Sequence, residues 1–416
     1  MIATPERRLP PRRQSILAAL QFRDFRLLWF GLLISNLGTW MQFTAMGYYV
    51  AKLDPSPHRV ALYLGFLGAA RAIPVLLASP IAGVVADTWP RRRVLLWANV
   101  AMSLAALALA IGTSLGHMTI VGLLIVSAVN SAAQSFDSPA RQSWVPMLVD
   151  RAYVGNAIGL NSVAFNAPAV IGPALAAILI ASVGVAGCFL VNAIATLAVV
   201  VAVAFMKPAP PSTQRREPFH HAIAFGVAFL ARHAILKWVI FSFVVTAIFV
   251  RPYSTLLPAF IINLLHGGAA ELGYAYTAAG AGGFGGALLT AYLGNRERRG
   301  AIWIVSGAVV ALGVFALGFV YNVAVALPII FIIGLGTLTF LGASNTLIQT
   351  LSPDALRGRA ISVYTMIALG IVPGGALIVG SIASILGLHT AFLIASAITI
   401  IVFAWLWSTK PILQTV

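Results

Sequence analysis

The chain has 416 residues, of which 60% are hydrophobic and only 9% are charged, and its mean hydropathy is +0.96. Soluble globular domains carry about 25% charged residues, so this composition excludes a soluble protein and indicates a chain that crosses a membrane many times. The net charge of +16 would suggest a nucleic-acid partner in a soluble chain, but the positions of the basic residues, given below, exclude that class.

Apolar runs bounded by charge, proline or glycine define the predicted elements, because about 20 apolar residues cover the ~30 Å of hydrocarbon in a bilayer. A basic arm over residues 1–25 precedes an N-terminal bundle over 26–206, with predicted spans at 26–50, 60–86, 94–114, 118–138, 156–181 and 186–206. A C-terminal bundle over 236–408 has predicted spans at 236–262, 271–294, 301–320, 324–345, 360–384 and 388–408. Between them, 207–235 is predicted to be a cytoplasmic linker with an interfacial helix, and 409–416 a cytoplasmic tail.

The basic residues gather on one side of this arrangement. Of the 26 Lys and Arg residues, we place all but four in or beside loops that share one face of the membrane. Lys52 and Arg59 lie in a loop on the other face, and Arg71 and Arg251 lie inside spans. Because short loops rich in Lys and Arg stay in the cytoplasm, we expect both termini to be cytoplasmic. The basic charge follows from membrane topology, so we expect a lipid bilayer and no nucleic acid as partner.

Polar and aromatic side chains interrupt the first two spans. Asn36, Trp40 and Gln42 in the first span are typical of a site for a large, partly planar substrate; hydrogen bonds between helices are the alternative explanation. Arg71 lies in the middle of the second span, where a charge costs on the order of a few kcal/mol. Its side chain must therefore face the bundle interior, where it contacts substrate or ties helices together through carbonyl groups.

A tight polar turn is predicted over residues 83–93, between the second and third spans. Five of its residues resemble the loop between helices 2 and 3 of major facilitator superfamily transporters: Gly83, Asp87, Arg91, Arg92 and Arg93. Thr88 and Pro90 depart from that motif, which usually has a basic residue and a glycine there. The resemblance implies an all-α polytopic membrane protein with twelve transmembrane helices in two six-helix pseudo-symmetric bundles around a substrate site. The alternative is an ordinary cytoplasmic loop that only sets orientation.

A polar stripe runs along the fourth span, because Asn130, Gln134 and Asp137 are spaced i, i+4 and i+7 and share one helical face. A stripe of this kind in hydrocarbon is typical of a cavity wall. All ten Asp and Glu residues lie in predicted loops or at span ends. Asp137, at the inner end of the fourth span, is therefore the best candidate for a proton-coupling group. The alternative is that Asp137 caps a turn at Ser138-Pro139.

The seventh span is predicted to form the matching wall of the second bundle. Thr246, Phe249 and Tyr253 share a helical face, and Arg251 places a second charge inside the membrane. The histidines of the preceding linker have no cysteine beside them, so we expect no metal site and no cofactor.

Arg357 and Arg359 open the eleventh span. In the superfamily, the aspartate of the loop motif braces the cytoplasmic ends of the two halves in the outward-open state. The resemblance therefore implies that Asp87 lies within reach of these two arginines and of the positive N-terminus of the eleventh span. The predicted conformational gate consists of Gly83, Asp87, Arg91, Arg92, Arg93, Arg357 and Arg359.

A narrower resemblance extends along the whole chain. Five segments look like the enterobactin-exporter and macrolide-efflux branch of the superfamily: residues 22–29, 34–41, 136–142, 251–253 and 356–359. One departure matters for mechanism. Thr39 stands where members of this branch often have aspartate, which leaves the usual route of proton antiport without its acid.

From these observations we expect a secondary active transporter that exports small organic molecules, siderophores or hydrophobic drugs, by proton-coupled alternating access. The resemblance implies a monomer in the bacterial inner membrane, and the two intramembrane arginines favour an anionic substrate. The alternatives are a permease for metabolite uptake and, in another class, a non-transporting membrane receptor or a lipid scramblase. An enzyme is not expected, because it would need clustered His, Asp or Glu inside the bilayer.

Overall fold

The computed structural model describes residues 15–207, 219–293, 299–410 and 413. In these ranges the first half contains η1 (Ala18–Gln21), α1 (Arg23–Leu53), α2 (Pro57–Thr88), α3 (Arg91–Ser114), α4 (Ile120–Trp144), η2 (Val145–Met147), η3 (Arg151–Tyr153) and α5 (Val154–Ala204). The second half contains α6 (Phe219–Arg232), α7 (Leu236–Phe249), α8 (Tyr253–Pro258), η4 (Ala259–Leu264), α9 (Ala269–Leu293), α10 (Arg299–Leu317), α11 (Val323–Leu351), α12 (Asp354–Leu386) and α13 (Leu388–Thr409).

The described helices provide twelve membrane crossings. Eight helical stretches are long and apolar enough to cross a membrane. One of them, α5, has 51 residues, about twice what one crossing needs, and it bends at Gly184, whose φ of 77° favours glycine. The helices α1, α9 and α12 have 31, 25 and 33 residues and pack against these stretches. No strand occurs in the described ranges, and the predicted all-α polytopic fold is confirmed.

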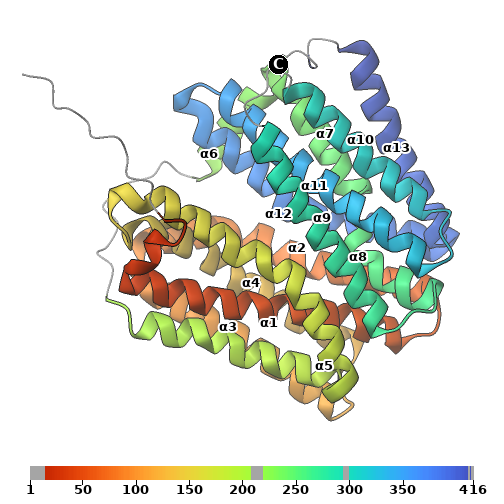
Figure 1. Ribbon diagram of the computed structural model, residues 1–416, viewed down its shortest axis with the longest axis horizontal. Helices are drawn as coiled ribbons and strands as arrows, with labels where there is room; N and C mark the ends of the chain where they lie inside the picture. Colours follow the sequence, from red (N-terminus) through yellow and green to blue (C-terminus); the bar gives the residue numbers. More distant parts are fainter. Residues whose placement is uncertain (1–14, 208–218, 294–298, 411–412, 414–416) are drawn as a thin grey trace, which may run out of the picture.

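The helices form two groups, α1 to α5 and α6 to α13, which meet at one end and diverge at the other (Figure 1). One buried apolar cluster contains residues of both groups, including Met46, Leu64, Phe189, Phe260, Leu272 and Val379. Two further clusters each belong to one group, the first around Phe25 and Trp144 and the second around Trp303 and Phe340. The halves therefore share a core near the turn between α1 and α2, which we call the shared end. Near the starts of α1 and α12 they keep separate cores, and we call this the separate end.

Glycines let the two halves approach closely at the shared end. A Cβ atom added to Gly380 of α12 would lie 2.6 Å from the carbonyl oxygen of Ala61 and 3.3 Å from the Cα atom of Gly65, both on α2. Likewise, a Cβ atom on Gly280 of α9 would lie 2.6 Å from the carbonyl oxygen of Ala169 on α5. Small residues permit this backbone approach in membranes, so these two crossings join the halves.

Two predicted boundaries are wrong because helices continue through them. The turn predicted over 83–93 is confined to residues 89–90, since α2 runs to Thr88 and α3 begins at Arg91. The fourth span, predicted to end at 138, continues to Trp144 although Pro139 lies inside it. Asp137 therefore lies within a helix, and the alternative that it caps a turn at Ser138-Pro139 is wrong.

The seventh span is broken where a single helix was predicted. It consists of α7, α8 and η4, and residues 250–252 separate the first two. A proline supplies the physical reason, because Pro252 has no N–H group to donate to the preceding turn. Arg251 lies in this break.

The described part of the linker is a helix that packs on the second half. A Cβ atom added to Gly226 of α6 would lie 2.8 Å from the carbonyl oxygen of Arg359 on α12. Residues 208–218 of the predicted linker, 1–14 of the N-terminal arm, and 411–412 and 414–416 of the tail lie outside the described residues.

Candidate transport site

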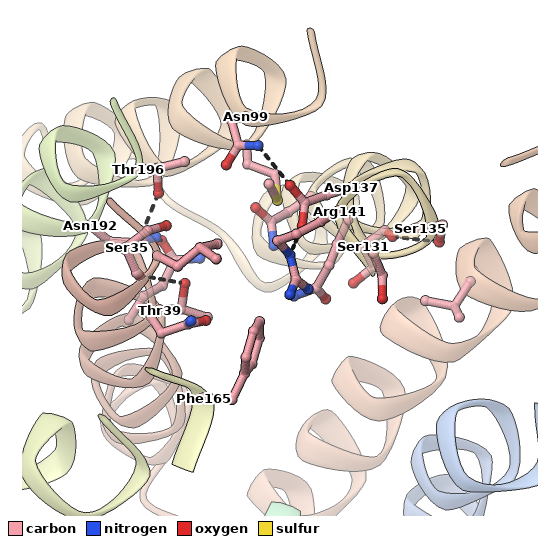
Figure 2. Close-up of a pocket in the computed structure, with 18 of the residues that line it drawn as sticks. Ser35, Thr39, Asn99, Ser131, Ser135, Asp137, Arg141, Phe165, Asn192 and Thr196 are labelled. Atoms are coloured by element: carbon pink, nitrogen blue, oxygen red, sulfur yellow. Dashed lines mark hydrogen bonds and ion pairs between the residues drawn. The ribbon is translucent and has the colours of Figure 1, made fainter. Parts of the chain in front are cut away.

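A cavity of about 410 Å³ lies inside the first half, and we call it the polar cavity. Six of the residues predicted for the substrate path or for coupling line it: Asn36, Gln42, Arg71, Asn130, Gln134 and Asp137. The polar stripe predicted on the fourth span thus faces this cavity. Figure 2 shows side chains from α1, α3, α4 and α5 pointing towards a common space.

Asp137 is held by two partners on different helices. Asn99 on α3 donates from Nδ2 to Oδ1 of Asp137 over 2.8 Å, and Arg141, one turn further along α4, donates from Nε to Oδ2 over 3.1 Å (Figure 2). The guanidinium of Arg141 also lies over the ring of Phe165, 4.3 Å from its centroid. Because both members of the ion pair are buried, the carboxylate is a charge that its surroundings must compensate.

Amide side chains connect α1 and α5 beside this ion pair. Asn192 donates from Nδ2 to Oε1 of Gln42 over 2.7 Å, and Asn36 donates to the carbonyl oxygen of Ala164 over 3.1 Å. Gly38 makes the approach possible, because a Cβ atom there would lie 2.7 Å from Oδ1 of Asn192. The amides of the first span therefore make the helix-to-helix hydrogen bonds of the alternative explanation, and they also line a cavity.

Arg71 reaches the polar cavity from α2. Its Nη2 atom lies 2.9 Å from the sulfur of Met46, and its guanidinium lies over the ring of Phe43, 5.1 Å from the centroid. Neither partner carries a charge. Arg71 is thus a cation stabilised by a polarisable sulfur and an aromatic face.

A second cavity, of about 240 Å³, lies between the two halves, and we call it the aromatic cavity. Trp40, Phe43, Tyr253, Tyr276 and Phe284 supply its rings. Arg251 lines it as well, and its Nη1 atom is buried without a hydrogen-bond partner among the described residues. The arrangement offers aromatic faces and a cation to a molecule held between the halves.

The fold and the cavities agree with what the chain resembles. The family described as "transmembrane secretion effector" matches residues 14–413. The chain belongs to this family, a branch of the major facilitator superfamily. It is 28% identical over 380 residues to the multidrug efflux pump Tap of Mycobacterium tuberculosis, with 88% of each chain covered. It is 25% identical over 347 residues to the enterobactin exporter EntS of Citrobacter koseri, covering 82% of this chain and 80% of that one.

Solved transporters share the fold at low sequence identity. A bacterial homologue of the human lysosomal transporter Spinster, in an inward-facing conformation, superposes with a TM-score of 0.73 at 13% identity, covering 94% of this chain and 96% of that one. A D-xylose–proton symporter superposes with a TM-score of 0.72 at 13% identity, covering 97% and 100%. The predicted superfamily membership is confirmed, and members of this family are transporters rather than enzymes.

Within this transporter fold, the remaining predicted path residues separate into two groups. Trp40, Arg251 and Tyr253 line the aromatic cavity. Thr246 and Phe249 are absent from the described walls of both cavities. Thr246 is buried and donates to the carbonyl oxygen of Ser242, and Phe249 packs against the shared core. The break after α7 explains the difference, because residues 246 and 253 no longer share one continuous helical face.

Sequence reasoning missed several residues of the site. Arg141 was placed in or beside a cytoplasmic loop, since the fourth span was predicted to end at 138, yet it lies inside α4 and pairs with Asp137. Its spacing of four residues from Asp137 was a usable signal, since opposite charges at that spacing meet on a helix. Asn99, Asn192 and Tyr276 had no such local signal, because only packing between distant helices brings them to the cavities.

The predicted gate residues occupy the ends of helices. Gly83 and Asp87 lie in the last turns of α2, and their side chains lie outside the described residues. Arg91 is buried and donates to the sulfur of Met147, and Arg92 donates to the carbonyl oxygens of Val203 and Ala204 at the end of α5, whereas Arg93 is exposed. On α12, Arg357 pairs with Asp354 at 2.7 Å, and Arg359 lies 5.4 Å from the ring centroid of Phe225.

Proposed function

We propose that the protein exports small organic molecules from the bacterial cytoplasm by alternating access, and that the polar and aromatic cavities form its substrate path. The observation that carries this proposal is the combination of one core shared by both halves at one end with two separate cores at the other. Halves joined in this way can rock about their contact. A molecule in the aromatic cavity between them is then exposed first to one side of the membrane and afterwards to the other.

The distribution of basic residues supports the direction. Arg91 to Arg93 and Arg357 lie at the separate end, and loops rich in arginine stay in the cytoplasm. The separate end is then cytoplasmic, as are both termini, and the cavities load from the inside of the cell. Efflux is further supported by relatives named as a multidrug efflux pump and an enterobactin exporter.

Asp137 is the proposed coupling group. Its carboxylate faces the polar cavity and has one partner on each oxygen. Adding a proton removes its charge and weakens the bond to Arg141, because a neutral acceptor binds a guanidinium less strongly than a carboxylate does. Arg141, which lines the same cavity, is then able to pair with another acceptor there, which gives proton binding a route to the substrate path without an acid at position 39.

Transport into proteoliposomes tests the proposal. With an acidic lumen, molecules inserted with the cytoplasmic side outward should accumulate a catecholate siderophore, a macrolide or a dye, and a protonophore should abolish the accumulation. Protein-free liposomes made from the same lipid serve as the control. Accumulation that requires an alkaline lumen would identify an uptake permease instead. Transfer of fluorescent lipid between leaflets without solute transport would identify a scramblase.

A further inference from the structure

Arg71 and Arg251 are charges inside the membrane without a carboxylate partner. The described residues form four ion pairs, and neither arginine belongs to any of them. Arg71 has a thioether sulfur and an aromatic ring as neighbours, and Nη1 of Arg251 has no hydrogen-bond partner among the described residues. A charge held in this way is costly in hydrocarbon, and among the described residues no carboxylate neutralises either guanidinium group.

The two arginines flank one aromatic wall. The guanidinium of Arg71 lies over one face of Phe43, and the ring of Phe43 meets that of Tyr276 edge to face, with 5.3 Å between centroids. Phe43 and Tyr276 line the aromatic cavity together with Arg251. Tyr276 is fixed there, because its hydroxyl donates to the carbonyl oxygen of Ser254 over 3.0 Å. Phe43 therefore connects the two sites, because Arg71, which lies over its ring, lines the polar cavity, whereas Arg251 lines the aromatic cavity together with Phe43.

We infer that the substrate is an aromatic organic anion whose acidic oxygens pair with Arg71 and Arg251 while its ring packs against Trp40, Phe43 and Tyr276. This inference rests on the proposed function and names its substrate class. Guanidinium groups bind carboxylate and phenolate oxygens through paired, charge-assisted hydrogen bonds, and aromatic side chains favour planar rings. Arg141 differs from these two arginines, because Asp137 already neutralises it.

A structural role for the two arginines predicts a different response to mutation. If each arginine braces the helices, its removal lowers the thermal stability of the empty protein. If each awaits an anion, replacing it by glutamine removes an uncompensated charge, so the Tm of the empty protein stays equal or rises while anion affinity falls. The Tm and the affinity together separate the two roles.

The test uses two dyes that share a xanthene ring and differ in charge. Binding of anionic carboxyfluorescein and cationic rhodamine 123 to the purified full-length protein is measured by fluorescence anisotropy, and transport of both in proteoliposomes. We expect the anion to bind more tightly, and Arg71→Gln and Arg251→Gln each to weaken its binding about tenfold or more without lowering the Tm of the empty protein. Arg26→Gln, at an exposed position near the start of α1, is the matched control and should change neither value.

The outcomes separate this inference from the proposed function. Equal binding of both dyes, or anion binding that both glutamine variants retain, overturns the inference. If rhodamine 123 is then still transported, the exporter function stands without the anionic substrate class. Arginine-dependent binding of carboxyfluorescein without transport of any solute supports the binding site and overturns the exporter function. A fall in Tm for both variants with unchanged affinity assigns the arginines to bracing and also overturns the inference.

Discussion

Asp137 and Arg141 form a buried ion pair one turn apart on α4, with 3.1 Å between Oδ2 and Nε and side chains 11% and 6% exposed. The pair lines the polar cavity beside Arg71, so the described wall carries two cations and one carboxylate. Neutralising that carboxylate leaves two uncompensated cations in one cavity. The charge of Asp137 therefore stabilises the site and holds Arg141 in position.

Replacing Asp137 by asparagine is expected to disconnect transport from the pH gradient. The asparagine can still accept from Asn99, but it neither titrates nor neutralises Arg141. Proteoliposomes with the variant should lose substrate accumulation under an imposed pH gradient, while substrate exchange without a gradient continues. The variant should also unfold more easily, by about 3 kcal/mol, because removing one partner of a buried ion pair leaves the other charge uncompensated.

Asp354→Asn is the matched control for that prediction. Asp354 pairs with Arg357 at 2.7 Å, but its side chain is 91% exposed, and exposed ion pairs contribute about 0–1 kcal/mol. Its accumulation of substrate under the gradient should equal that of the unaltered protein. Gradient-driven accumulation that survives in Asp137→Asn would assign proton coupling to another group.

Much of the fold could be predicted from the sequence, because every crossing of the hydrocarbon region in this chain must be an apolar helix. Each span must satisfy its own backbone, so apolar runs such as 94–114 and 388–408 correspond to α3 and α13 with small errors at their ends. The errors are larger where polar or proline residues lie inside a helix. Pro139 does not end α4, whereas Pro252 lies in the break between α7 and α8, and the local sequence does not distinguish these cases.

The site was only partly predictable, because its geometry depends on contacts between helices. The stripe of Asn130, Gln134 and Asp137 follows from helical spacing alone, and it does face a cavity. The partners that hold Asp137 and Gln42 lie on other helices, at Asn99 and Asn192. Their positions follow from how α3 and α5 pack, which no local pattern in the sequence records.

A bulky residue at position 380 should separate the halves at the shared end. In Gly380→Leu the side chain would collide with the backbone of α2 near Ala61 and Gly65, so the conformation closed at this end becomes less favourable. A cysteine placed at Leu64, which is 1% exposed, should then react faster with a maleimide than it does without the leucine. The native Cys188 is fully buried and gives little background.

Gly374→Leu is the control on the same helix, because a Cβ atom at Gly374 would meet no atom within 4 Å. In Gly374→Leu, the rate at which the cysteine at position 64 is labelled should match the rate in the protein that keeps both Gly374 and Gly380. Equal rates in Gly380→Leu and Gly374→Leu would show that the crossing of α2 and α12 does not control opening of the shared end.

Cysteine labelling in intact cells should reveal the orientation in the membrane. Lys52 and Arg93 are exposed at opposite ends of the first half, one near the end of α1 and the other near the start of α3. A membrane-impermeant maleimide should label Lys52→Cys in intact cells, and Arg93→Cys only after permeabilisation, because the arginine-rich turn stays in the cytoplasm. The reverse pattern would place the separate end outside the cell and contradict loading from the cytoplasm.

Neutralising Asp87 should weaken transport without affecting membrane insertion. Asp87 lies at the end of α2, and the resemblance to the superfamily motif predicts that it braces the N-terminus of α12, whose first turn carries Arg357. A helix N-terminus favours a negative charge by about 0.3–1 kcal/mol, so Asp87→Asn should lower the efflux rate severalfold by destabilising one of the two conformations. Efflux is measured in cells together with the abundance of the protein in isolated membranes.

Asp150→Asn, in the exposed loop before η3, removes the same charge from a position outside the motif and should leave both values unchanged. Normal efflux by Asp87→Asn would reduce the motif to a determinant of topology, in which its arginines orient the chain and its aspartate has no part in the gate.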